Sequence, residues 1–273
     1  LTGGGGRDTY AFETDWGEDR FNDSDGATVL DFTAMANSVS LSIDKRAVNA
    51  VDDRTGEEVR ISGTQVEEIR LSAHDDTLRA SAFPEWDIVV EDAGGSDDYL
   101  FRMDRAGRSG DPGSFDLIET GAGFDEIVLE QSRARNAGDA ILLGLGSVVN
   151  GREAITYQPG LLDRLTIKGK GAVFGPDRIT SLGGDVRFAS ADGVSAIDMG
   201  ATELRVIGRD VHQDSALMAG GLIWEEVRDI DVVHDVTLLN SGDLDMRTYG
   251  DGSDLLLAAD IRSAAGLMDG TGG

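Results

Sequence analysis

The stretch Gly3-Gly-Gly-Gly-Arg-Asp-Thr-Tyr10 contains the clearest motif of this chain. It matches the pattern G-G-x-G-x-D-x-U at every fixed position, where U is a large apolar residue, here Tyr10. Glycine adopts positive φ at no steric cost, so the run predicts a tight turn, after which Tyr10 begins a strand by pointing into the core. A glycine-rich turn followed by an aspartate is also an ordinary β-turn, so one copy does not establish a repeat.

Degenerate copies of the same turn recur at positions 16–21, 92–99, 120–127 and 249–256. Each copy keeps at least one glycine, the aspartate and the apolar residue in phase. The glycines and aspartates in phase are Gly17 and Asp19, Gly95 and Asp97, Gly123 and Asp125, and Gly252 and Asp254. A spacing that recurs without a local reason predicts a repeat protein, in which short strands alternate with tight turns.

Composition also favours an all-β chain with many turns. The 273 residues include 37 glycines but only 4 prolines, and 40% are hydrophobic, which excludes collagen and plain disorder. The best helical candidates, near residues 131–145 and 159–165, are interrupted by glycines, so we expect at most a short helix there. There are no cysteines, and therefore no disulfide and no thiolate metal site.

The net charge of the chain disfavours some classes of binding partner. Acidic residues number 51 against 24 basic residues, for a net charge of −27, which repels nucleic acid and anionic lipid headgroups. Divalent cations or salt would offset this repulsion, although acidity can also serve solubility alone. No apolar run approaches the about 20 residues of a membrane span. The glycine-rich ends suggest a segment of a longer chain, with neighbouring repeats of that chain as its first partners.

The turns resemble the calcium-binding repeats of RTX proteins, the hemolysin-type family of type I secretion substrates. The segment VEEIRLSAHDDTLRA, from Val66 to Ala80, is similar to a connecting segment of that family and places Asp76 at the aspartate position. The segment GATVLDFTAMANSVSLSID, from Gly26 to Asp44, resembles a strand pair that follows such turns in very large surface proteins. The resemblance implies a parallel β-roll or β-helix, Ca2+ as cofactor, and secretion to the medium or cell surface.

By this resemblance, calcium ligands come from turn carbonyls and from the aspartate of each turn. The residues implied are Gly4, Gly6, Asp8, Asp19, Asp76, Gly95, Asp97, Gly123, Asp125, Gly252 and Asp254. Full sites in the family need copies nine residues apart in tandem, and this chain lacks such a run, so the sites are expected to be partial. The intervals 97 − 76 = 21 and 125 − 97 = 28 instead suit coils of a larger solenoid, with these aspartates stacked along one edge.

The second half of the chain also has strand periodicity. In residues 183–211, Val186, Phe188, Val194, Ile197, Leu204 and Val206 fall on one face. Residues 241–266 repeat the theme from Leu244 onward, and both segments resemble the right-handed β-helix of filamentous-hemagglutinin proteins. We therefore expect a parallel β-solenoid with an RTX-like part at 1–130, a junction at 131–182 and β-helix coils at 183–273, or one continuous solenoid.

These features predict a structural or adhesive segment of a large extracellular protein, acting as stalk, fibre or surface-layer component. A β-helix module that binds or cleaves surface polysaccharide is the main alternative, and a calcium-independent unit that assembles into homo-oligomers or fibres is another. No catalytic residue is predicted, because a chain with 51 acids generates carboxylate pairs by chance. His74, His212 and His234 lack the spacing of a helical zinc site, and the glycine runs lack the Lys-Ser/Thr of a phosphate loop.

Overall fold

A computed structural model describes most of the chain. The described residues are 5–17, 19–22, 26–44, 47–62, 65–103, 112–119, 122–131, 140–158, 160–169, 173–174, 179–181, 184–193, 196–209, 211–226, 230–232, 234–239, 244–248, 255–257 and 261–263. Every regular element among these residues is a β-strand, which confirms the expected all-β class. Two compact units are present, the first comprising residues 1–128 with 152–158 and the second 129–151 with 159–273.

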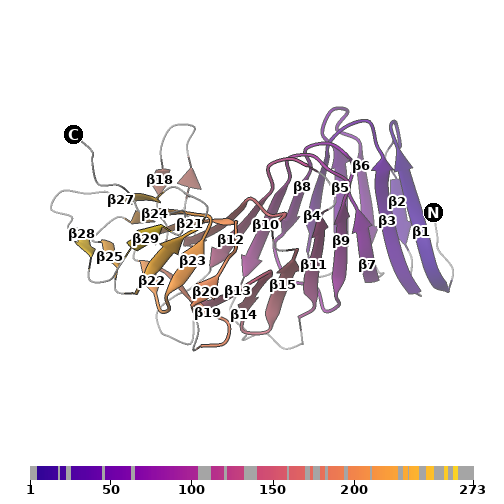
Figure 1. Ribbon diagram of the computed structural model, residues 1–273. Helices are drawn as coiled ribbons and strands as arrows, with labels where there is room; N and C mark the ends of the chain where they lie inside the picture. The colour runs from indigo at the N-terminus through magenta and orange to yellow at the C-terminus, as the bar shows by residue number, and fades with distance from the viewer. Residues whose placement is uncertain are drawn as a thin grey trace. The chain divides into compact units, whose positions relative to one another are not determined.

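The first unit contains one wholly parallel run of strands. In spatial order these are β1 (Gly6–Glu13), β3 (Gly26–Ala34), β7 (Gln65–Arg70), β9 (Ile88–Asp92), β11 (Ser114–Glu119) and β15 (Glu153–Tyr157). Figure 1 shows β1, β3, β7, β9 and β11 side by side, coloured indigo to magenta. Strands adjacent in this sheet are separated in sequence by a strand of the second sheet or more, as parallel pairing requires a crossover.

The second sheet of this unit is mixed. Its order is β2 (Asp19–Asn22), β6 (Glu58–Ser62), β5 (Ala47–Asp52), β4 (Val39–Ile43), β8 (Thr77–Ala80), β10 (Asp98–Met103) and β12 (Glu126–Gln131). The strands β4, β5 and β6 pair antiparallel to one another, whereas β4, β8 and β10 are parallel. An antiparallel excursion is therefore inserted between β2 and the parallel strands, a feature that the parallel solenoid expected from the sequence does not include.

In the second unit, three sheets carry most of the strands. One has the order β14 (Ser147–Asn150), β13 (Ile141–Gly144), β19 (Val186–Ser190) and β22 (Val211–Gln213), with β13 and β14 antiparallel. Two parallel sheets are β16 (Arg164–Gly169), β21 (Glu203–Gly208), β24 (Gly221–Glu226) and β27 (Leu244–Thr248), and β20 (Ile197–Asp198), β23 (Leu217–Ala219), β26 (Val236–Leu238) and β29 (Ile261–Ser263). Two small pairs join β17 (Val173–Phe174) to β18 (Ile179–Ser181) and β25 (Ile230–Val232) to β28 (Leu255–Leu257).

Alternating apolar residues form the cores of both units, because successive side chains of a strand point to opposite faces. In the first unit, Leu30, Ile69 and Val90 of one sheet and Leu41 and Leu78 of the other are buried. In the second unit, the inner-face residues expected from the sequence are buried at Val186, Phe188, Ile197, Leu204 and Val206. Val194 lies outside the described residues.

Two details of the sequence reading are wrong. The expected turn before Tyr10 is already strand from Gly6, so Asp8 lies within β1, paired with Thr28 of β3, and not in a turn. The parallel neighbour β3 extends β1 backwards, because ladder pairing overrides the local turn preference of glycine. Leu244, expected on an inner face, is 39% exposed; its strand β27 is last in its sheet order.

Aromatic side chains pack together beside β1 and β2, the first strands in the two sheet orders. Phe12 stacks on Phe32 with ring centroids 4.6 Å apart, while Trp16 and Phe21 meet Phe12 edge to face. Such pairs add about 0.5–1.5 kcal/mol beyond the burial of their area. The cluster covers the core of the first unit beside β1 and β2, which have no further strand of the described chain on their other side.

Phe32→Ala is expected to reduce the free energy of unfolding by about 3–5 kcal/mol, because the ring is fully buried against Phe12. Urea unfolding followed by circular dichroism measures this loss. The matched control is Phe124→Ala, whose ring is 46% exposed and whose loss is expected to change stability by no more than about 0.5 kcal/mol. Equal effects of the two substitutions would contradict the placement of Phe32 in the core.

Candidate functional site

The corners that join the two sheets of the first unit are linked by a column of aspartates. The backbone N–H of Val39 donates to Oδ1 of Asp76 at 2.6 Å, and the N–H of Asp76 donates to Oδ1 of Asp97 at 2.6 Å. The N–H of Asp97 in turn donates to Oδ1 of Asp125 at 3.0 Å. The partners are 21 and 28 residues apart, so the stacking along one edge expected from these intervals is observed.

The backbone carries the same register through these corners. The N–H of Asp98 donates to the carbonyl of Asp76, and the N–H of Glu126 donates to the carbonyl of Asp97. On the exposed side, the N–H of Ser96 donates to Oδ1 of Asp75 at 2.8 Å, and Ser96 Oγ accepts the N–H of Phe124 at 3.0 Å. Neighbouring corners therefore satisfy one another's backbone N–H and carbonyl groups. Such groups cost free energy when they are buried without a hydrogen-bond partner.

The glycines of these corners allow close approach between coils. A Cβ on Gly95 would lie 2.3 Å from the carbonyl oxygen of His74, and one on Gly123 would lie 1.4 Å from the carbonyl oxygen of Gly95. Gly95 also has a positive φ of 137°, a conformation that other residues rarely adopt. The turn motif predicts both glycines in calcium turns; in the structure they leave room for the backbone of the neighbouring corner.

Gly123→Ala is expected to destabilise the protein by about 1–3 kcal/mol or more, because the new methyl group overlaps a backbone carbonyl that cannot rotate away. The measurement is chemical denaturation of the variant beside Gly5→Ala, a position where a Cβ meets nothing within 4 Å. An unchanged unfolding midpoint for Gly123→Ala would show that the corners are not stacked this closely.

A buried acidic cluster lies within this column. One carboxylate oxygen from each of Asp76, Asp92 and Asp97 lies within 4.8 Å of the others, and these side chains are only 2%, 2% and 1% exposed. Within the described part of the chain, no other group of three His, Cys, Asp or Glu side chains is this close together. Hard oxygen ligands in such a group suit Ca2+ or Mg2+, so these residues could hold a metal ion.

Each side chain of the cluster is held by neighbouring groups. Asp76 accepts the N–H of Ser72 at 2.7 Å, and the Ser72 hydroxyl lies 3.0 Å from both of its carboxylate oxygens. Asp92 accepts the N–H of Gly94 at 3.0 Å and the Tyr99 hydroxyl at 3.3 Å. Locked rotamers of this kind keep the carboxylates in place before any ligand arrives.

Burial makes the charged forms of this cluster costly. Burial raises the pKa of Asp76 to about 6, although hydrogen bonds from Val39 and Ser72 oppose the shift. Burial, together with Asp92, raises the pKa of Asp97 well above its ordinary value. In the absence of a cation, Asp97 therefore holds a proton at neutral pH that it can share with Asp92.

This protonation makes stability depend on pH in cation-free buffer. The unfolded chain releases the Asp97 proton above about pH 4 while the folded chain keeps it, so the contribution is complete below that pH and is lost as pH rises. Asp97→Asn carries an amide hydrogen at every pH, so its stability relative to the parent protein is expected to increase between pH 4 and 8. Urea unfolding with a chelator present tests this. Stability curves of Asp97→Asn and the parent protein that stay parallel over this pH range would contradict the shared proton.

The remaining predicted ligands do not join this cluster. Gly6, with φ of 123°, and Asp8 lie in β1, and Asp19 begins β2. Gly4, Gly252 and Asp254 lie outside the described residues. Asp92 was not among the predicted ligands, although the sequence contains a signal for it: Ile88, Val90 and Asp92 are in phase on β9, so Asp92 occupies an inward position.

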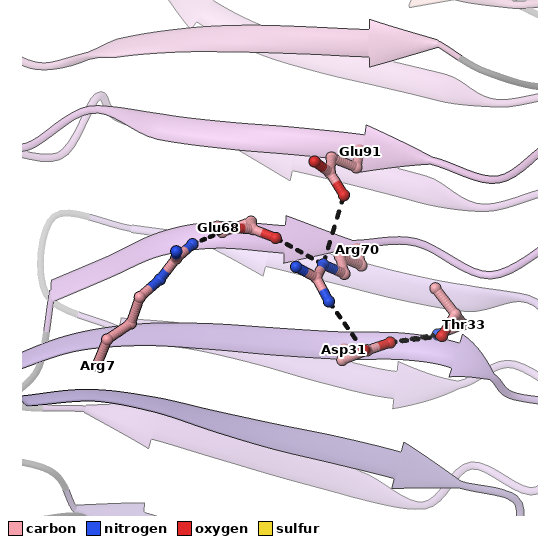
Figure 2. A network of polar contacts seen from close by, with 6 residues as sticks. All are labelled: Arg7, Asp31, Thr33, Glu68, Arg70 and Glu91. Atoms are coloured by element: carbon pink, nitrogen blue, oxygen red, sulfur yellow. Dashed lines mark hydrogen bonds and ion pairs between the residues drawn. The ribbon is translucent and has the colours of Figure 1, made fainter.

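A second polar network crosses the outer face of the parallel sheet (Figure 2). Glu68 contacts Arg7 of β1 and, at 2.5 Å, Arg70 of its own strand β7. Arg70 also reaches Asp31 of β3 at 3.5 Å and Glu91 of β9 at 3.4 Å. Glu68 is buried, whereas the side chains of Arg7 and Arg70 are exposed to solvent. Ion pairs of exposed side chains contribute little individually, about 0–1 kcal/mol, but this network spans four neighbouring strands. The network joins neighbouring strands of the sheet by placing opposite charges next to one another.

Comparisons with known proteins identify no relative: no protein-family model, curated protein or solved structure matches this chain significantly. The described residues contain no helix that is long and apolar enough to cross a membrane.

Proposed function

We propose that this chain is a structural segment of a large extracellular repeat protein, in which a calcium-stabilised β-solenoid acts as a stalk, fibre or surface-layer component. The observation that carries the proposal is the aspartate column, in which Asp76, Asp97 and Asp125 each accept a backbone N–H from the neighbouring corner. Carboxylates used in this way hold coils together and are not directed at a substrate.

The parallel sheet supports the same proposal. From β1 to β15, each strand pairs with its neighbours in a continuous parallel ladder, as expected when successive coils stack and each contacts only the next. The antiparallel strands β5 and β6 are then an insertion into the solenoid. The outer face of this sheet carries matched charges, so its side chains also join neighbouring coils.

Calcium and an extracellular location enter the proposal from the resemblance to RTX repeats. A chain with 51 acidic residues repels itself where divalent cations are scarce, and cations bound by the folded state would favour folding after export. Type I secretion is the route that this resemblance implies. The neighbouring repeats of a longer chain are the partners that fit best.

The polysaccharide alternative has less support. Trp86, a candidate for stacking on sugars, is only partly exposed, and its indole N–H donates to the carbonyl of Val66 at 2.9 Å. Trp16 packs edge to face against Phe12 and Phe32. Both rings thus contribute to packing within the first unit.

Removal of one whole coil tests the solenoid. Deletion of residues 76–96 joins Asp75 to Asp97, so that Asp97 takes the position of Asp76 opposite Val39, and the ladder can re-form in register. We expect the shortened chain to retain its β circular dichroism and a cooperative unfolding transition, with a smaller denaturant m-value because less surface is buried.

The matched control deletes residues 76–86, which removes part of a coil and, because the number of deleted residues is odd, places the inward residues Ile88 and Val90 at the positions of Thr77 and Arg79, out of phase. This variant is expected to unfold, because a shift in register moves apolar side chains to the solvent face. If the whole-coil deletion unfolds as completely as the control, the stacked-coil proposal is wrong. Size measurement across protein concentration separates a monomeric spacer from a self-assembling unit.

A further inference from the structure

We propose that Asp76, Asp92 and Asp97 form a divalent-cation site, best matched to Ca2+, inside the corner where β9 turns into β10. The inference deepens the proposed function and rests on it for the role of the ion, which is to join successive coils. The site differs from those that the turn motif implies, since its ligands are buried side-chain carboxylates and one of them, Asp92, lies outside the aspartate position of any turn.

The separation of the carboxylates fits a single ion. Ca2+ binds oxygen ligands at about 2.3–2.6 Å, so two oxygens on opposite sides of one ion are about 4.8 Å apart. The oxygens offered by Asp76, Asp92 and Asp97 lie within 4.8 Å of one another. Three carboxylates can supply up to six oxygens, which approaches the six to eight that Ca2+ takes.

An unmet electrostatic requirement points to a ligand. Oδ2 of Asp97 is fully buried and has no hydrogen-bond donor, although the side chain is only 1% exposed. The Asp92 carboxylate lies within hydrogen-bonding reach of Asp97, but two carboxylates can interact favourably only through a proton or a cation. A cation satisfies this buried oxygen and neutralises the neighbouring charges at the same time.

The surroundings are already arranged for such an ion. Asp92 is oriented by Tyr99 and Gly94, and Asp76 by Ser72, so binding requires little side-chain ordering. Asp76 belongs to the corner before β8 and Asp97 to the corner before β10, while Asp92 ends β9. An ion shared by all three therefore fastens two consecutive coils at the point where their backbones already touch.

Terbium luminescence tests the site directly, because Tb3+ substitutes for Ca2+ and emits when excited through a nearby phenol. Tyr99 lies next to the cluster, with its hydroxyl 3.3 Å from Asp92. We expect tyrosine-sensitised Tb3+ emission from the full chain that Ca2+ displaces. Tyr99→Phe is expected to lose this emission while calorimetry still detects Ca2+ binding, weakened by no more than about 10–100-fold because the variant also loses the hydroxyl that orients Asp92. Displaceable emission that is unchanged by Tyr99→Phe would place the ion elsewhere.

The ligands are tested by Asp92→Asn and Asp97→Asn, with Asp98→Asn as the control. Asp98 is adjacent in sequence and begins β10, but its side chain is exposed, so the control makes the same chemical substitution outside the cluster. Loss of an outer-shell partner typically weakens metal binding about 10–100-fold, so each ligand variant is expected to bind Ca2+ at least about tenfold more weakly at this site, and the control within about twofold. Equal affinities in all three variants would overturn the proposal.

Substitution by asparagine separates an effect on Ca2+ binding from an effect on folding. The amide of Asp97→Asn can accept the Asp76 N–H and donate to Asp92, so this variant is expected to fold in the presence of a chelator. Ca2+ is then expected to raise the melting temperature of the parent chain more than that of Asp97→Asn, and a rise of the same size in both would also overturn the site. The coil-deletion experiment removes Asp76 and Asp92 and asks only whether coils stack, so the two proposals can fail independently.

Discussion

Successive corners of the first unit depend on one contact, a buried carboxylate that accepts the backbone N–H of the equivalent aspartate one corner earlier. An N–H in a buried corner must find an acceptor, and a carboxylate forms a shorter and stronger bond than a neutral group. The contact fixes the register of each corner relative to the next. The parallel ladders, the close glycines and the ion pairs of the outer face all require this register.

The same contact creates an electrostatic problem. Aspartates stacked at the spacing of β-strands bring negative charges close together where water cannot screen them. Backbone donors offset part of this cost for Asp76, whereas Asp97 is left with a raised pKa and an oxygen that lacks a donor. In the absence of a cation, a proton on Asp97 relieves the repulsion, and a bound divalent cation can replace that proton. The net charge of −27 causes repulsion over the whole chain, which bound cations would also reduce.

Much of the fold could be predicted from the sequence. Alternation identified inward residues such as Phe188 and Leu204, and the intervals of 21 and 28 residues located the column of Asp76, Asp97 and Asp125. Strand direction could not be predicted, because β4 and β5 alternate in the same way whether their neighbours are parallel or antiparallel. Glycine was ambiguous for a related reason: at Gly123 it is required by a carbonyl one coil away, and local sequence says nothing about that carbonyl. Asp92 was missed because only the folded corner brings it to Asp97.

The distances in sequence between joined corners are unequal: 37 residues from Val39 to Asp76, then 21 and 28. The longest interval contains the antiparallel strands β5 and β6, which leave the coil and return to it before Asp76 is reached. Each corner thus fixes the register of the strands beside it, and additional residues between two corners form hairpins or loops. A chain organised in this way can accept an insertion between two corners, whereas the insertion or deletion of a single residue at a corner would move the aspartate away from the N–H that it accepts.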